Sequence, residues 1–161
     1  MEPDLSPSLR WPRRNSRRTM ARLLIVDDDV EFREALRASL VGLGYQVDRA
    51  SHGADALMAI RLVRPDVVLL DIKMPGLGGV EVLKQIRAMD PTIPVIMVTA
   101  ADDPVLIRET REIGAYGYLV KPIEEPRLHR MVAEAVARSQ ADHEGRVRVA
   151  RPAGTGSSRG F

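Results

Sequence analysis

Two hydrophobic patterns alternate along residues 20–140, and together they predict five strands and five helices in succession. Short runs of consecutive apolar residues, such as 67–70, are typical of strands that are buried on both faces. Between these runs, apolar residues recur every three or four positions, as at Leu128, Val132 and Ala135, which is typical of amphipathic helices. The expected strands cover residues 22–26, 45–50, 67–71, 94–99 and 116–120, and the expected helices cover 30–42, 54–63, 80–89, 104–113 and 126–139.

The alternation itself indicates the fold class. Strands joined by helices through short connections predict a parallel sheet with right-handed crossovers and helices on both faces, a doubly wound α/β fold. For five such units, the flavodoxin-like strand order 2-1-3-4-5 is the leading choice. In that order the first and third strands are neighbours, and their carboxyl ends border the crevice where such sheets bind ligands.

Composition divides the chain into one domain and two tails. At 161 residues, 45% of them hydrophobic, the chain is long enough for a single core. Residues 1–19 mix Pro, Ser and Arg without periodicity, and the last residues are rich in Gly, Ser and Arg. We expect 1–19 to be a disordered basic arm, 20–140 the folded domain, and 141–161 a disordered tail with no output domain. An equally open alternative is that the natural chain starts at Met20.

Charge and composition also limit the location and the partners. The chain has no cysteine, no apolar stretch near the ~20 residues of a membrane span, and no hydrophobic region of a secretory signal. We therefore expect a cytoplasmic protein with no membrane partner. The net charge of +2 comes from the tails, because residues 20–140 carry a net charge of −3. Since arginine charge alone gives only non-specific contacts with phosphates, nucleic acid is not an expected partner.

Polar side chains stand where four of the expected strands end. Asp27 and Asp28 follow the first strand, Asp71 ends the third, Thr99 ends the fourth, and Lys121 follows the fifth. Parallel strands present their carboxyl ends at one edge of a sheet, with neighbours about 5 Å apart. We therefore expect the three carboxylates to converge, with the hydroxyl and the ammonium beside them.

Three carboxylates this close repel one another. Two unit charges about 5 Å apart at an effective dielectric of about 20 repel by roughly 3 kcal/mol, so a carboxylate takes up a proton or a cation binds. An oxygen-only ligand set without His or Cys favours Mg²⁺, or Mn²⁺, over softer ions. With Lys121 and Thr99 placed to hold phosphoryl oxygens, Asp71 is left as a carboxylate nucleophile. A purely structural acid cluster is the simpler alternative, but capping the next helix requires only one acid, Asp29.

Four segments carry a resemblance to a known family. They are Leu-Leu-Ile-Val-Asp-Asp at 23–28, Asp-Ile-Lys-Met-Pro-Gly-Leu-Gly-Gly-Val-Glu at 71–81, Val-Thr-Ala at 98–100 and Gly-Tyr-Leu-Val-Lys-Pro at 117–122. Each segment is weak alone, but all four occur in order on the expected strands. With them, about three quarters of the chain resembles the receiver domain of bacterial two-component response regulators, the CheY-like family.

The resemblance implies a role for each acid. Asp71 would accept a phosphoryl group from a histidine kinase or a phosphotransfer protein. Asp28 would be a direct metal ligand, Asp27 would act largely through water, and the backbone carbonyl of Lys73 would supply a further ligand. The metal so held would be Mg²⁺, with Mn²⁺ as a substitute.

The resemblance also implies a switch. Thr99 and Tyr118 would form a pair in which the hydroxyl follows the phosphoryl group and the aromatic ring moves inward. Lys121 would bind the phosphoryl group, and the bond between Lys121 and Pro122 would be cis. Cis bonds otherwise occur in only about one in twenty X–Pro pairs of folded proteins.

The predicted function is that of a single-domain response regulator, not an enzyme. Phosphorylation of Asp71 would control a surface on the last two helices and the last strand, which a downstream protein would bind. Two alternatives stay open. The chain could be the receiver of a DNA-binding transcriptional regulator that lacks its output domain. It could also be an aspartyl-phosphate hydrolase, although haloacid-dehalogenase-like hydrolases have an acid two residues after the nucleophile, where this chain has Lys73.

Overall fold

Five parallel strands form one sheet in the order β2-β1-β3-β4-β5, which confirms the predicted arrangement. The computed structural model describes residues 20–100 and 103–150. The strands are β1 (Arg22–Val26), β2 (Gln46–Ala50), β3 (Val67–Asp71), β4 (Val95–Thr99) and β5 (Gly117–Val120). The helices described are α2 (Val30–Gly42), α3 (Gly53–Leu62), α4 (Gly79–Met89), α5 (Pro104–Ile113) and α6 (Glu125–Ala150). Every boundary except the end of α6 lies within one residue of its predicted position.

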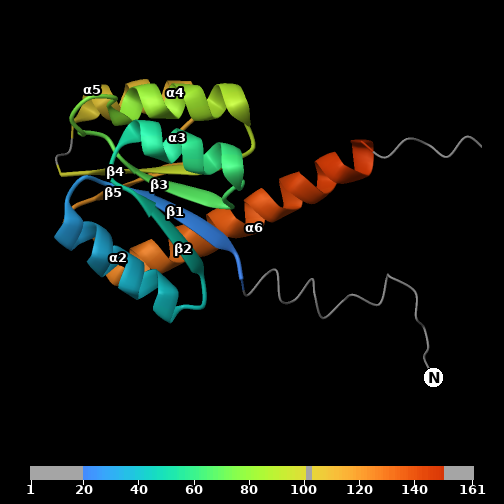
Figure 1. Ribbon diagram of the computed structural model, residues 1–161, viewed down its shortest axis with the longest axis horizontal. Helices are drawn as coiled ribbons and strands as arrows, with labels where there is room; N and C mark the ends of the chain where they lie inside the picture. The colour runs from blue at the N-terminus through green and yellow to red at the C-terminus, as the bar shows by residue number, and fades with distance from the viewer. Residues whose placement is uncertain (1–19, 101–102, 151–161) are drawn as a thin grey trace, which may run out of the picture.

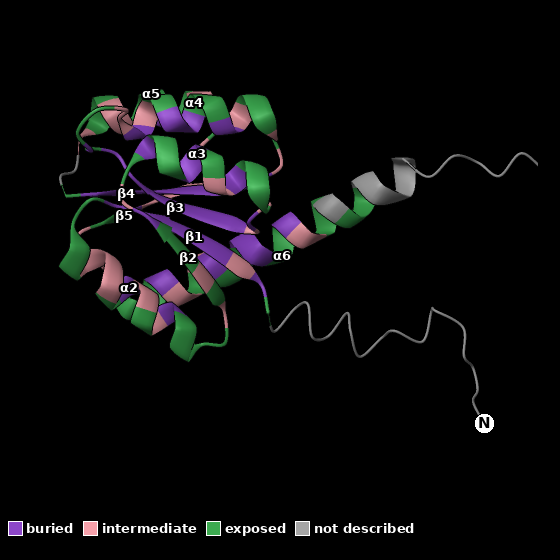
Figure 2. Cartoon of the chain, viewed as in Figure 1, coloured by how far each residue is buried: buried purple, intermediate pink, exposed green. Residues whose placement is uncertain are grey.

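Helices cover both faces of the sheet, with α3, α4 and α5 on one side and α2 and α6 on the other (Figure 1). Because side chains alternate along a strand, each central strand supplies both cores. Leu24 and Leu70 belong to the core under α3 and α4, whereas Leu23 and Leu69 belong to the core under α2 and α6. The middle strands are therefore almost wholly buried, while the edge strand β2 is largely exposed (Figure 2). This double burial explains the continuous apolar runs in the sequence.

Polar residues and glycine set the helix ends. The side chain of Asp29 accepts a hydrogen bond from the N–H of Phe32 at 3.2 Å, so Asp29 is the predicted N-cap of α2. Asp103 caps α5 in the same way, and Pro104 occupies the first turn, where no N–H is needed. Gly114 ends α5 at a φ of 119°, in the left-handed region that favours glycine.

Gly79 allows a close backbone approach that holds the loop after β3. Its N–H donates to the carbonyl of Ile72 at 2.9 Å. A Cβ at this position would lie 2.2 Å from the carbonyl oxygen of Asp71 and 2.7 Å from the Cα of Ile72. Both of these neighbours are backbone atoms, so only glycine fits here. The start of α4 thereby fixes the segment that carries Asp71.

The predicted end of the last helix is wrong. We expect it near residue 139 because the apolar periodicity stops there, but α6 continues to Ala150. Residues 141–150 of the predicted disordered tail are therefore helical, and the helix extends away from the sheet (Figure 1). An established helix propagates at little cost through residues of fair helix propensity, and no proline occurs between Pro126 and Pro152. The predicted arm at 1–19 and the rest of the tail, 151–161, lie outside the described residues.

None of the helices in the described ranges is long and apolar enough to cross a bilayer.

Candidate metal centre

Three carboxylates converge at the carboxyl ends of β1 and β3, as the strand order predicts. The two strands pair in parallel, with Val26 opposite Leu70, so the residues that follow them meet at one edge of the sheet. Asp27, Asp28 and Asp71 each offer a carboxylate oxygen, and these oxygens all lie within 4.8 Å of one another. Two of the three residues are buried and Asp28 is exposed, so the cluster opens to solvent on one side.

Asp27 is the most strongly held of the three acids. It is 1% exposed, and its Oδ1 accepts a hydrogen bond from the N–H of Asp29 at 2.9 Å. Its Oδ2 forms an ion pair with the Nζ of Lys121 at 2.8 Å. The ammonium of Lys121 therefore lies beside the carboxylates, as expected, but it pairs with Asp27 in particular. Lys121 comes from the end of β5, and its side chain is long enough to cross to the end of β1.

Asp71 is buried but only weakly hydrogen-bonded. It is 6% exposed, its Oδ1 accepts from the N–H of Lys73 at 3.3 Å, and its Oδ2 lies 4.0 Å from the Nζ of Lys121. Burial and, to a lesser degree, the charge of Asp27 together raise the pKa of Asp71 to about 6, against the opposing effect of Lys121. Asp71 thus resists ionisation, as expected for a buried carboxylate beside two other acids.

Lys121 is placed by both the backbone and an aromatic ring. The Lys121–Pro122 bond is cis, as the family resemblance implies, and the N–H of Lys121 donates to the carbonyl of Thr99 at 2.8 Å. The ammonium also lies over the ring of Phe32, 4.1 Å from its centroid. We did not predict Phe32 as a site residue, because its helical spacing indicates only a core-facing position. Its contact with Lys121 arises because the first turn of α2 follows directly on the end of β1, where the ammonium pairs with Asp27.

The other predicted site residues lie near the cluster, but their roles stay predictions. Thr99 is buried at the end of β4, the strand next to β3. Lys73 has an exposed side chain, and its N–H contacts Asp71. No contact in the structure tests its backbone carbonyl as a metal ligand.

Tyr118 is held by α5. Its hydroxyl donates to the carbonyl of Ile107 at 2.6 Å and also contacts the hydroxyl of Thr110. Thr110 is fully buried, and no pattern in the sequence distinguishes it from an ordinary helix threonine. The ring of Tyr118 therefore lies between β5 and α5, and its pairing with Thr99 in a switch stays a prediction.

The donor set fits a hard divalent cation. The three converging acids supply only carboxylate oxygens, and Lys121 compensates for one of their charges. The remaining negative charge and the partial burial favour an oxygen-seeking ion at this position. Asp28, Asp71 and Asp27 are the residues that would hold it.

The chain belongs to the response regulator receiver domain family, whose model matches residues 23–133. This range contains the acidic cluster and all of the sheet except Arg22. The fold and the acidic cluster indicate a response regulator receiver domain, and the family match agrees with them.

Particular relatives support this assignment. The chain is 40% identical over 103 residues to sporulation initiation phosphotransferase F of Bacillus subtilis. The matched region covers 64% of this chain and 83% of that protein. It is 38% identical over 118 residues to the transcriptional regulatory protein ZraR of Klebsiella oxytoca, covering 73% of this chain and 27% of ZraR. The chain thus spans about a quarter of the length of ZraR. A solved structure of a putative response regulator from Chloroflexus aurantiacus matches with a TM-score of 0.70 and 38% identity, covering 73% of this chain and 98% of that one.

Proposed function

We propose that the chain accepts a phosphoryl group on Asp71 from a histidine kinase or a phosphotransfer protein of a two-component pathway. The observation that carries this proposal is that the buried carboxylate of Asp71 lies beside two other carboxylates and an ammonium group. Asp71 is 6% exposed, its carboxylate lies within 4.8 Å of those of Asp27 and Asp28, and the Nζ of Lys121 is 4.0 Å away. Transfer to a carboxylate requires a reactive oxygen with positive charge close to it, and this geometry provides both.

Among the three acids, Asp71 is the best nucleophile. Both oxygens of Asp27 are engaged, one by the N–H of Asp29 and the other by Lys121. Asp28 is exposed, so water competes for its carboxylate oxygens, and its side chain is held less firmly for attack on a phosphoryl group. The Oδ2 of Asp71 faces Lys121 at 4.0 Å and accepts no hydrogen bond from the described residues.

The transfer exchanges one bond to phosphorus for another. An oxygen of Asp71 bonds to phosphorus while the P–N bond to the donor's histidine breaks, and that electron pair stays on the imidazole nitrogen, which then takes up a proton. Lys121 can move from Asp27 to a phosphoryl oxygen, because its ammonium already lies between the two carboxylates. The hydroxyl of Thr99 would donate to another phosphoryl oxygen. Mg²⁺, or Mn²⁺ in its place, would offset the charge of the acids and of the phosphoryl group when bound.

The phosphorylated protein would signal through the face formed by α5, β5 and α6. Tyr118 belongs to this face, because it stands on β5 and its hydroxyl contacts α5, and its predicted pairing with Thr99 would link the face to the site. Two exposed apolar side chains on the face, Val105 at 70% and Val120 at 39%, offer contact area to a protein partner. Phosphorylation would shift the equilibrium between two conformations of this face, and the partner would bind one of them.

The protein would not turn over substrates as a hydrolase does. The position two residues after Asp71 carries Lys73, whose exposed ammonium cannot act as the carboxylic acid that haloacid-dehalogenase-like hydrolases place there. Any loss of the phosphoryl group would then be self-dephosphorylation.

Phosphorylation with a small-molecule donor tests the proposal. The folded protein would be incubated with acetyl phosphate and Mg²⁺ and separated on a phosphate-affinity gel. Wild type should give a retarded band. Treatment with hydroxylamine should remove this band, because hydroxylamine cleaves acyl phosphates but not phosphoserine. Asp71→Asn should give no such band, whereas Asp55→Asn, an exposed acid on α3, should behave like wild type. A hydroxylamine-sensitive band that persists in Asp71→Asn would overturn the assignment.

A second candidate function rests on the relatives. The ZraR match is to a transcriptional regulatory protein of which this chain spans about a quarter, whereas the phosphotransferase F match spans most of that protein. The chain could therefore act as the receiver unit of a DNA-binding regulator. Sequence-specific DNA binding that increases on phosphorylation of Asp71 would favour this second function, and phosphorylation-dependent binding of a protein to the face formed by α5, β5 and α6 would favour the first.

A further inference from the structure

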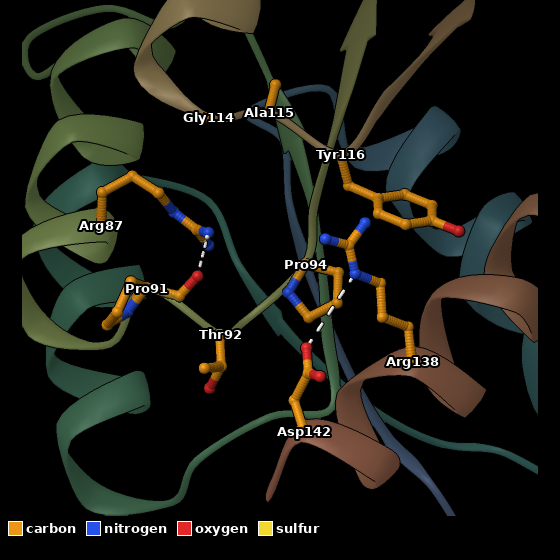
Figure 3. A pocket seen from close by; sticks show the side chains of 9 residues that line it. All are labelled: Arg87, Pro91, Thr92, Pro94, Gly114, Ala115, Tyr116, Arg138 and Asp142. Carbon is orange, nitrogen blue, oxygen red and sulfur yellow. Dashed lines mark hydrogen bonds and ion pairs between the residues drawn. The ribbon is translucent and has the colours of Figure 1, made fainter.

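A cavity lies at the opposite end of the sheet from the acidic cluster. Its volume is about 290 Å³, at the lower limit of small-molecule sites. Its lining comes from the segments that precede β4 and β5, the C-terminal ends of α4 and α5, and the middle of α6. Arg87 and Arg138 approach it from opposite sides (Figure 3). Two guanidinium groups therefore face one small polar space.

Arg87 has an unused pair of donors. Its Nη1 donates to the carbonyl of Pro91 at 2.8 Å. Its Nε and Nη2 are buried and meet no hydrogen-bond acceptor among the described residues. These two nitrogens share one edge of the guanidinium, the edge that binds two oxygens of a carboxylate or phosphate side by side. A buried donor without an acceptor costs free energy, so this pair of donors calls for an explanation.

The acids nearby do not supply that acceptor. Asp90 is engaged by Arg64 at 2.9 Å and by the hydroxyl and N–H of Thr92. Asp142 lies 3.9 Å from the Nε of Arg138, a long contact between two largely exposed side chains. Burial lowers the pKa of Arg87, and the charge of Arg138 lowers it further, against the effect of Asp90. The positive charge of Arg87 is thus incompletely compensated.

The second guanidinium is positioned by an aromatic ring. The Cζ of Arg138 lies 5.6 Å from the ring centroid of Tyr116, in reach of a cation–π contact. Tyr116 itself is fixed, because its N–H donates to the carbonyl of Val95 at 2.8 Å. A structural role for Arg87, which would be to hold the Pro91 carbonyl, uses only Nη1 and leaves the rest of the arrangement unexplained.

We infer that this cavity binds a small oxyanion, a phosphate or carboxylate group, between Arg87 and Arg138. Two of its oxygens accept from Nε and Nη2 of Arg87, and Arg138 provides the second positive charge. Because Nε and Nη2 of Arg87 are shielded from solvent, binding requires side chains that line the cavity to move aside. Asp142 competes with the ligand for Arg138, so it weakens binding. This site is independent of the phosphoacceptor at Asp71.

Titration with inorganic phosphate, followed by amide NMR of the full chain at constant ionic strength, tests the inference. Saturable shifts are expected at Gly114, Ala115 and Tyr116, and chloride at equal ionic strength should not reproduce them. Acetate in a parallel titration distinguishes carboxylate from phosphate as the preferred group. Arg87→Lys keeps the charge but loses the paired donors, and it should weaken phosphate binding at least tenfold.

Two surface variants keep the test decisive if substitution of Arg87 impairs folding. Arg138→Gln should weaken phosphate binding several-fold, and Asp142→Asn should strengthen it, because the two changes remove a cation and a competing anion. Shifts that stay linear with concentration, that chloride reproduces, or that centre on Asp71 would overturn the inference. Equal affinity in wild type, Arg138→Gln and Asp142→Asn would overturn it as well.

Discussion

Neutralising Asp71 should stabilise the metal-free protein, and the gain should grow as pH rises. Asp71→Asn keeps the size of the side chain and an oxygen that can accept from the N–H of Lys73, but it removes the buried charge. Burial and the charge of Asp27 raise the pKa of Asp71 from 3.8 to about 6 in the folded protein. This shift corresponds to about 3 kcal/mol of unfavourable free energy once Asp71 is fully ionised.

The sign follows from the protons bound in each state. Between pH 4 and pH 6 the folded protein keeps a proton on Asp71 that the unfolded chain has lost. Stability from this group is therefore fully present below the unfolded pKa and is lost as pH rises through the folded pKa. Between pH 5 and pH 8 the loss is about 1 to 1.5 kcal/mol, and Asp71→Asn, which cannot titrate, avoids it.

Urea unfolding in EDTA at pH 5 and pH 8 measures the effect. The stability of Asp71→Asn relative to wild type should increase by about 1 to 1.5 kcal/mol between the two pH values. Glu109→Gln, a charge removal on the exposed side of α5, is the control and should show a much smaller change. A difference between Asp71→Asn and wild type that does not change with pH would refute the reasoning.

Magnesium should reverse the order of stabilities. Binding to the folded state stabilises it by an amount that grows with the ratio of ligand concentration to dissociation constant. Wild type should therefore gain stability in millimolar Mg²⁺ at pH 8, and Asp71→Asn should gain much less because it lacks one of the three carboxylates. An equal gain in both proteins would show that the ion does not bind at the acidic cluster.

Two further changes test the packing around the site. Gly79→Ala places a methyl group 2.2 Å from the carbonyl oxygen of Asp71 and should lower stability by about 2 kcal/mol or more in urea unfolding, whereas Gly42→Ala, with open space around it, should change stability by less than about 1 kcal/mol. Lys121→Met leaves Asp27 buried without its partner and should cost about 3 kcal/mol in EDTA, and adding Asp27→Asn should recover part of that loss. Additive effects in this double-mutant cycle would show that the ion pair does not couple the two residues.

The sequence determined the fold and the composition of the acidic cluster. Strands buried on both faces must be apolar throughout, so runs such as 67–70 mark them directly, and Asp71 marks where burial ends. Once the strand order is assumed, Asp27, Asp28 and Asp71 must meet, because parallel neighbours end at one edge. The length of α6 was not predicted, because apolar periodicity reports where a helix packs and not where it stops.

Only the tertiary structure decided how these groups interact. Asp27 and Lys121 are 94 residues apart, and their pairing depends on side-chain reach across the ends of the sheet, which no local pattern encodes. The same is true of Arg87 and Arg138, ordinary helix arginines in the sequence that face one cavity in the fold. Desolvation and Coulomb interactions depend on what surrounds a group in space, so the raised pKa of Asp71 and the unpaired donors of Arg87 arise only when distant segments pack together.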